Sequence, residues 1–383
     1  MTGEPRSFSL NDGGPFYQVM RRLRLIRGSG MISGPVLALF AWLPIVVGEA
    51  ARVVLGMAPD PTLTDLSMHV RLLVALPLVL FSERLVEPAA ASSIRSLYVT
   101  NVCDASALDD IVARGERLRD AWLPEALLAS LAFIGGQLAL WHVFGATGVF
   151  HGATGAGAFS FPRMWYVVIA LPLAQFVMLR WMWRWTIWSL MLAHIARQPL
   201  RTLATHPDKA AGLACLARPV AGCGAFACAI GSVLASAWGT QILAGRTTVE
   251  AELPALVAFL LIVVAVAVAP LLLFCGHLYR GRRRAIAQYG DFASRYTCDF
   301  HDKWIVHATP ESPLGAQDIQ ALNDLGGAYN VVVTTRFFVF GPSTLMPLWF
   351  GAILPMVPLF ASILSVEHVL KRILGTLLGG LPL

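Results

Sequence analysis

The chain has 383 residues, of which 56% are hydrophobic and only 14% are charged. Because a soluble domain carries about 25% charged residues, this composition excludes a soluble globular protein and predicts one that crosses a membrane several times. A formal net charge of +6 would favour nucleic acid as the partner of a soluble protein, but membrane topology accounts for it here, and we expect no nucleic-acid partner.

Seven apolar segments follow a polar, basic stretch at residues 1–30. No small-residue cleavage site follows the first of them, so we expect it to act as an uncleaved anchor in the lipid bilayer. The segments lie at 31–48, 70–87, 121–144, 164–193, 219–243, 254–277 and 345–364.

The distribution of basic residues predicts the orientation. With the N-terminus inside, 23 of the 29 lysines and arginines fall on inside stretches and 4 fall on outside ones. The positive-inside rule therefore places the N-terminus in the cytoplasm. We predict an all-α fold, a polytopic transmembrane helical bundle with six or seven spans.

The predicted organisation has four parts. These are a cytoplasmic N-terminal segment (1–30), a six-helix transmembrane domain (31–278) with cytoplasmic helical loops at 88–120 and 196–218, a cytoplasmic helical segment (279–343), and a proline-containing seventh membrane segment with an amphipathic tail (344–383). We favour a full seventh span followed by an interfacial helix, with a re-entrant hairpin as the alternative, and the side of the C-terminus stays open.

The second segment raises the question of intramembrane charge. In "RLLVALPLVLFSER", eleven uncharged residues separate Arg71 from Glu83 and Arg84, and they cover about 16 Å of a hydrocarbon core that is roughly 30 Å thick. If this helix spans, a charge lies in the lipid or at its edge. Two other segments bring charge to the same level. The third begins with Glu125, and the fourth carries Arg180 and Arg184 after the uncharged run 164–179.

Two interpretations of these charges are open. The arginines could snorkel to the headgroups within an interfacial belt formed by Trp181, Trp183, Trp185 and Trp188. Alternatively, the charged residues form a buried cluster in which Glu83 pairs with Arg180 or Arg184, because charges in lipid cost several kcal/mol and usually pair. The members of this cluster would be Glu83, Arg84, Glu125, Arg180 and Arg184. Such a cluster could be structural, line a conduction path or carry protons. We predict that Glu83 lies within ion-pair distance of Arg180 or Arg184.

The fifth segment carries small residues every four positions, with Gly224, Cys228, Ser232 and Ser236 on one ridge and Ala227, Gly231 and Ala235 on another. Small ridges let membrane helices approach closely. Tight packing within the bundle is the leading interpretation. A pore-lining face or the contact face of a homo-oligomer is the alternative.

The stretch "ATHPDKAAGLACL" (204–216) is the most distinctive cytoplasmic sequence. Thr205 and Asp208 have the spacing of a capping box, and Pro207 fits the first helical turn. We therefore expect this motif, which also includes His206 and Gly212, to open the fifth helix. Further along, Ile319, Leu322, Leu325 and Tyr329 recur at helical spacing, which predicts an amphipathic helix packed on the membrane domain.

Two further stretches carry side chains that could bind a ligand. "CDFHDKWIVH" (298–307) matches no strong metal template, and an ordinary polar loop is the favoured interpretation, so we expect no metal site and no cofactor. "RGRRR" supplies Arg280, Arg282, Arg283 and Arg284 directly after the sixth segment, where it predicts a contact with anionic lipid headgroups.

Three stretches carry a family resemblance: "HPDKAAGL", "SERLVEPAAASSIRSL" and "DIQALNDLGGAYNVV". They resemble an uncharacterised family of bacterial polytopic membrane proteins, which shows a cytoplasmic His-Pro-Asp-Arg-Ala-Gly-Gly-Leu stretch, an acid-plus-proline end to an early helix and a late Asp-Ile-Gln helix. This chain departs at Lys209 and Ala211. The resemblance spans residues 70–360 and implies architecture without an activity. We expect a multi-pass protein of the bacterial cytoplasmic (inner) membrane.

The sequence contains no familiar nucleotide-binding, serine hydrolase or zinc protease motif, so an enzyme is not the favoured reading. The favoured function is a channel or transporter for an ion or small solute, with the charged cluster at its cytoplasmic rim. The alternative is a non-transporting scaffold or signalling protein that docks a partner on its cytoplasmic loops. A continuous polar path would favour the first hypothesis, and a dry core would favour the second.

Overall fold

The computed structural model describes residues 8–22, 26–27, 31–32, 34–57, 66–145, 160–307 and 316–363. In this part of the chain the fold is an all-α bundle, with a two-residue hairpin of β1 (Ile26–Arg27) and β2 (Met31–Ile32) near its start. Six helices are long and apolar enough to cross a membrane, or seven if one bent pair counts as a span. The predicted fold class, a multi-pass helical membrane protein, is confirmed.

The first half of the bundle is built from α1 (Pro15–Arg22), α2 (Gly34–Val54), α3 (Leu66–Val70), α4 (Leu76–Thr100), α5 (Ala105–Asp120), α6 (Trp122–Gly145), α7 (Phe161–Trp165) and α8 (Leu171–Ala196). Two π-helical turns, η2 (Arg71–Ala75) and η3 (Tyr166–Ala170), join α3 to α4 and α7 to α8. The second half contains η4 (Ala214–Ala217), α9 (Arg218–Leu243), α10 (Val249–Leu272), α11 (Cys275–His301), η5 (Asp302–Val306), α12 (Gln317–Val333), α13 (Pro342–Ile353), η6 (Leu354–Met356) and α14 (Val357–Ile363).

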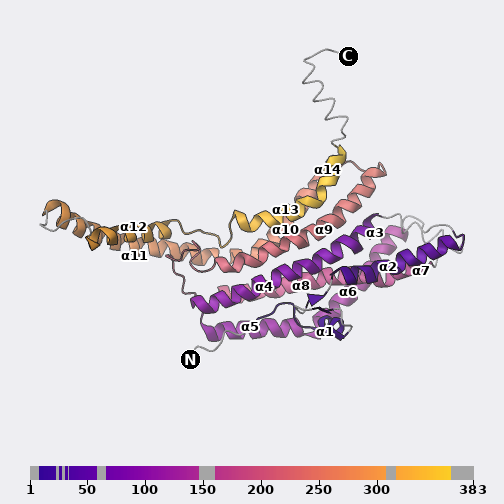
Figure 1. The fold of residues 1–383 in the computed structure, drawn as a ribbon, viewed down its shortest axis with the longest axis horizontal. Coiled ribbons are helices and arrows are strands. Elements are labelled where there is room, and N and C mark those ends of the chain that lie inside the picture. Colours follow the sequence, from indigo (N-terminus) through magenta and orange to yellow (C-terminus); the bar gives the residue numbers. More distant parts are fainter. Residues whose placement is uncertain are drawn as a thin grey trace, which may run out of the picture.

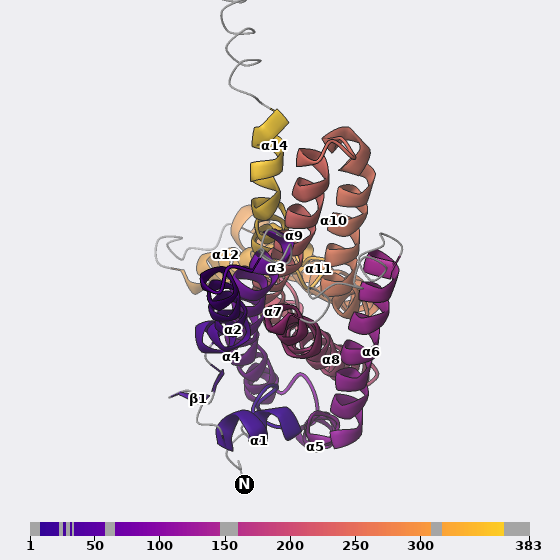
Figure 2. The same cartoon turned by 90° about the vertical axis from the view of Figure 1, so that its right-hand side faces the viewer.

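Helix α9 lies between two neighbours that run in opposite directions. The Ser82 hydroxyl donates to the carbonyl of Gly222 (2.8 Å) and that of Ser93 to Cys215 (2.6 Å), so α4 runs antiparallel to α9. We call the end where α4 finishes and α9 begins the inner end, which is the predicted cytoplasmic one. In Figures 1 and 2, α1 and α5 lie together on one side of the bundle, and α10, α13 and α14 lie on the other.

The seventh segment runs parallel to α9. A Cβ atom added to Gly224 would overlap Pro347, and one added to Gly239 would approach Leu359 at 3.2 Å, so both helices ascend together from the inner end. Pro355 lies in the 3₁₀ turn η6, which lets the helical run continue into α14. This direction matches the full span that we favoured over a re-entrant hairpin. The predicted tail helix after 364 and the loop at 146–159 lie outside the described residues.

The small residues of α9 serve packing within the bundle. Gly224 faces Gly351 of α13 so closely that a side chain on either would overlap the other helix. On the opposite face, a Cβ on Gly222 would lie 3.0 Å from the backbone nitrogen of Val86 in α4. Because these glycines have no side chain, the backbones of α4, α9 and α13 approach closely. Small residues stabilise helix pairs in lipid in this way.

Helix α12 packs mainly on α11 and reaches the membrane domain only at its last turn, where Val332 meets Ala204, so that prediction is wrong. It lies along α11, and the two helices extend away from the bundle at its inner end (Figure 1). Periodicity identified the inward face of α12, which includes Leu322 and Leu325, but it could not name the partner that covers it. The expected polar loop at 298–307 is also wrong, because these residues complete α11 and η5.

The contact between α9 and α13 yields a stability prediction. Replacing Gly351 with Ala forces the methyl group into the carbonyl of Gly224, and we expect it to lower the free energy of unfolding by about 1–3 kcal/mol. Thermal unfolding of the purified protein in detergent measures the change. The matched control is Gly135→Ala in α6, where no atom lies within 4 Å of the new Cβ. Equal melting temperatures for the two variants would contradict the close packing.

Candidate functional site

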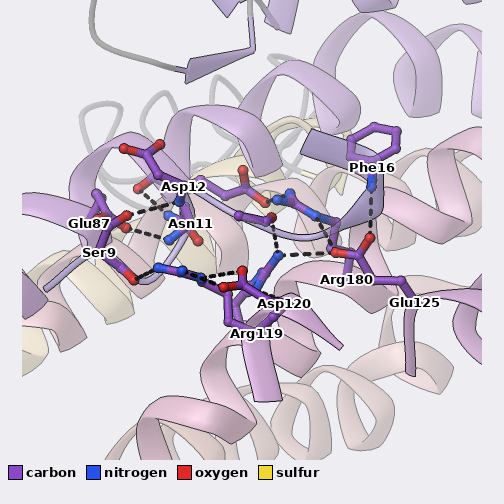
Figure 3. Close-up of polar contacts among 12 residues, drawn as sticks. Ser9, Asn11, Asp12, Phe16, Glu87, Arg119, Asp120, Glu125 and Arg180 are labelled. Carbon is purple, nitrogen blue, oxygen red and sulfur yellow. Dashed lines mark hydrogen bonds and ion pairs between the residues drawn. The ribbon is translucent and has the colours of Figure 1, made fainter. Parts of the chain in front are cut away.

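Four charged side chains meet inside the bundle (Figure 3). Arg180 of α8 donates from Nη1 to Oε1 of Glu83 in α4, at 2.7 Å. Arg184, one turn later, donates from Nη2 to Oε1 of Glu125 in the first turn of α6, at 3.0 Å. The Nε of Arg180 lies 3.6 Å from the same Glu125 oxygen, which links the two pairs. The predicted contact between Glu83 and an arginine of the fourth segment is therefore present.

The cluster is sealed from solvent. Arg180 and Arg184 are 1% and 2% exposed, and Glu125 is 3% exposed. Arginines that snorkel would reach the surface, so that interpretation is wrong for both of them. Three tryptophans of the supposed interfacial belt, Trp181, Trp185 and Trp188, are also buried. Desolvated charges of this kind are tolerated only when they are paired, and two carboxylates balance two guanidinium groups here.

Arg84 does not belong to this buried cluster. Its side chain is exposed, whereas that of Glu83 is 7% exposed. Consecutive helical residues point about 100° apart, so the helix face that buries Glu83 against α8 turns Arg84 outward. The spacing of Arg180 and Arg184, by contrast, puts both on one face of α8, as the sequence predicted.

The N-terminal segment covers one side of the cluster, a contact that the sequence analysis missed. The backbone N–H of Phe16 donates to Oε2 of Glu125 at 2.8 Å, and Arg184 donates to the carbonyl of Gly13 at 2.8 Å. The guanidinium of Arg180 lies 5.2 Å from the centroid of the Phe16 ring, a cation–π contact. Gly14 has a φ of +89°, and a Cβ there would lie 2.5 Å from Glu125, so only glycine fits this turn.

A second set of polar contacts holds the same N-terminal segment in place (Figure 3). The Glu87 carboxylate accepts from the backbone N–H groups of Leu10 and Asn11, at 3.0 and 2.8 Å. Arg119 donates to the carbonyl of Ser9 and forms a two-bond pair with Asp120. The turn sequence Asn-Asp-Gly-Gly-Pro between Leu10 and Phe16 was the available signal for this ordered segment.

A cavity of about 200 Å³ lies on the outer side of the cluster. It is lined by residues of η2, α4, α8 and α9, including Arg71, Val79, Gln175 and Met178. Glu83 follows Val79 by one helical turn, so the cavity ends about 6 Å along α4 from the ion pair. Arg71 is the only charged residue among those that line it, and it donates to the hydroxyl of Tyr166 at 2.7 Å.

A short repeat underlies this arrangement, and the sequence analysis missed it too. "ALPLVLF" (75–81) and "ALPLAQF" (170–176) each follow a five-residue π-helical turn, and each places proline in the first turn of the next helix. Arg71 and Tyr166, which hydrogen-bond to each other, begin the two π turns. Single π turns inside α-helices occur frequently at functional sites.

The motif at 204–216 folds differently from the predicted capping box. Thr205 caps no helix, and residues 204–213 form consecutive turns. The Asp208 carboxylate instead accepts from the N–H groups of Ala210, Gly212 and Ala214, at 2.9–3.1 Å, and leads the chain into η4. Gly212, with a φ of +89°, supports the last turn, while Pro207 is exposed and His206 contacts Asp208. The turn is therefore organised by a carboxylate that accepts backbone N–H groups, and not by the two reciprocal hydrogen bonds of a capping box.

The four arginines after the sixth segment lie on α11, and the structure separates them. Arg280 and Arg284 line a cavity at the inner end of the bundle. Arg282 instead donates to the carbonyl of Val333 at 2.6 Å and lies 4.6 Å from the Phe337 ring centroid. Arg283 is exposed and does not line that cavity.

No protein-family model, no curated protein and no solved structure matches this chain. The resemblance of three stretches to an uncharacterised bacterial family therefore stays a prediction. Among the residues that the structure describes, no group of three or more histidine, cysteine and acidic side chains is arranged to hold a metal ion.

Arg180 lies near two carboxylates, whereas Glu83, among the described residues, pairs with Arg180 alone, and this difference yields a second prediction. Arg180→Gln leaves Glu83 buried without its cation, and we expect it to lower the free energy of unfolding by about 3–5 kcal/mol. Glu83→Gln leaves Arg180 beside Glu125, so its cost should be smaller. Thermal unfolding in detergent gives both values. The control is Arg95→Gln, which removes an exposed charge from the same helix and should change stability by less than about 0.5 kcal/mol. An equal loss for Arg95→Gln would contradict the burial of the pair.

The Asp208 turn yields a pH prediction. Burial raises the pKa of Asp208, but the three backbone N–H groups and His206 outweigh burial and hold the pKa below 3.8. A carboxyl group whose pKa is lower in the folded state stabilises the fold above the unfolded value and loses this contribution as the pH falls through the folded value. We expect Asp208→Asn to cost about 1.5 kcal/mol near neutral pH and progressively less below about pH 4. Melting curves of both proteins across this range test it, and a difference independent of pH would refute it.

Proposed function

We propose that this protein is a channel or transporter for a small anion or anionic solute in the cytoplasmic membrane of a bacterium. The observation that carries the proposal is the cavity between η2, α4, α8 and α9, which ends one helical turn from the Glu83–Arg180 pair. Its volume of about 200 Å³ suits a small solute. Membrane permeation paths are commonly built where ionisable residues face the bundle interior.

The charges near the cavity indicate the sign of the solute's charge. Arg71 is the only charged group in the lining, and the next charges inward form a cluster in which carboxylates and guanidinium groups balance. A fixed positive charge in a low-dielectric wall attracts anions and repels cations. Gln175 in the same lining adds a neutral donor and acceptor that can replace part of an anion's hydration.

In this proposal the N-terminal segment closes the path beside the ion pair. Phe16 packs on Arg180 and against the ring of Phe176, at a centroid distance of 5.0 Å, while Gly13 and Gly14 lie directly on Arg184 and Glu125. A solute that passes the ion pair must displace this segment. Release of Phe16 would therefore accompany opening, and the arrangement described above is the closed state.

A scaffold function is the second candidate, because one observation favours it. The hairpin of α11 and α12 extends beyond the bundle and leaves apolar side chains accessible, among them Phe292, Ile305 and Ile319. Such an arm suits a protein partner or a second copy of the chain. It adds nothing to a permeation path, so the two functions predict different results in a transport assay.

Anion efflux from liposomes that contain the purified full-length protein tests the proposal. We expect a low chloride flux from the wild type and a higher flux from Phe16→Ala, because the smaller side chain loosens the closure beside the ion pair. In the Phe16→Ala background, Arg71→Gln should reduce the anion flux at least several-fold, because it removes the positive charge from the cavity. Potassium flux measured in parallel reports selectivity.

The matched control is Arg246→Gln, which removes an exposed positive charge from the outer turn between α9 and α10 and leaves the cavity lining intact. It should leave the anion flux unchanged. Thermal unfolding confirms that each variant is folded. A folded Phe16→Ala protein that conducts neither chloride nor potassium would exclude the permeation function and leave the scaffold function.

A further inference from the structure

A second cavity lies at the inner end of the bundle, away from the ionic cluster. Its volume is about 530 Å³, and it opens between the connection that follows α8 and the first turns of α11. The polar side chains that line it are Asp104, Arg201, Thr202, His277, Arg280 and Arg284. Neither the favoured function nor its alternative requires this cavity.

Backbone packing holds its three arginines together. Arg280 and Arg284 are four residues apart and share one face of α11. Gly281 between them packs against Thr202, where a Cβ would lie 2.9 Å from the hydroxyl oxygen, so α11 approaches the neighbouring connection closely. The N–H of Arg201 donates to the carbonyl of Val102 at 2.8 Å, which fixes that connection.

Two further contacts brace the cavity wall. The Nε2 atom of His277 hydrogen-bonds the carbonyl of Ala196 at 2.7 Å and joins the start of α11 to the end of α8. The Nε of Arg280 donates to the carbonyl of Gly276, at 3.1 Å, within α11. The cavity wall is thus formed by backbone elements that contact one another, and the exposed side chains of Arg201, Arg280 and Arg284 line it.

The charges in the cavity are unbalanced. Three guanidinium groups face one carboxylate, that of Asp104, which accepts a hydrogen bond from Ser106. Among the described residues, no carboxylate forms an ion pair with Arg201, Arg280 or Arg284. Like charges that converge on one cavity repel one another, and an anion that binds all of them relieves this repulsion. Arginine forks bind phosphate with two parallel hydrogen bonds, which makes phosphate the best-matched anion.

We propose that this cavity binds a phosphate group through Arg201, Arg280 and Arg284. The site lies where α10 ends and α11 begins, at the inner end of the spanning helices, so the phosphate can belong to the headgroup of an anionic lipid or to a soluble phosphate compound. Of the four arginines after the sixth segment for which a lipid contact was predicted, this site uses only Arg280 and Arg284. Arg282 and Arg283 lie outside this site, and Arg201, from a distant part of the sequence, completes it.

Native mass spectrometry of the purified full-length protein tests the site with two probes. These are dioleoylphosphatidylglycerol and inorganic phosphate, each titrated separately and then in competition. We expect binding that weakens about fivefold when any one of the three arginines is replaced by glutamine, since each basic group near a phosphate contributes a comparable factor. Binding of the lipid without displacement by inorganic phosphate identifies a headgroup site. Binding of inorganic phosphate itself identifies a soluble phosphate ligand, and either result supports the site.

Arg283→Gln is the matched control, because it removes the same charge from the same helix outside the cavity. It should bind both probes as the wild type does. Two results would overturn the proposal. One is an equal loss of binding for Arg283→Gln and Arg280→Gln, which would indicate attraction by the surface as a whole. The other is the absence of binding of either probe to the folded wild type. Chloride flux is measured separately, so this test stands apart from that of the proposed permeation function.

Discussion

The structure depends on keeping charge neutral where water is absent. Two carboxylates and two guanidinium groups lie in the interior of the bundle, each at most 7% exposed, and none is stable there without the others. They come from α4, α6 and α8, so satisfying them fixes how these three helices sit against one another. The second segment can hold a charged residue after so short an apolar run because the protein, rather than lipid, surrounds Glu83.

The N-terminal segment is held in place by the same need to satisfy buried charges. Buried guanidinium groups need more acceptors than two carboxylates supply, and the carbonyls of Gly13 and Arg119 provide them for Arg184. The carboxylate of Glu125 in turn accepts the backbone N–H of Phe16. A polar segment that would otherwise be an unremarkable start of the chain is therefore ordered by the cluster. This link connects the inner surface of the protein to the centre of its bundle.

The other half of the bundle is held without charges. Helix α9 approaches α4 and α13 through glycines, so backbone contacts replace side-chain packing there. The polar half and the small-residue half meet where Trp181 of α8 stacks on Phe226 of α9, at a centroid distance of 3.7 Å. Both cavities discussed above lie at edges of this framework, one against the cluster and one below the spans. Each is lined by more positive than negative charge.

Local sequence properties predicted the apolar helices and the pairing of Glu83 with an arginine, because hydropathy and charge act residue by residue. They also placed Arg180 and Arg184 on one face, since helical periodicity is local. Only the tertiary structure decided that Arg84 stays outside the cluster, that Asp208 rather than Thr205 organises its turn, and that α12 packs on α11. It also joined Gly13 to Arg184 and brought Arg201 to the cavity that Arg280 lines. These last two arrangements link residues far apart in the chain, and whether two such residues meet depends on how the helices pack rather than on any local pattern.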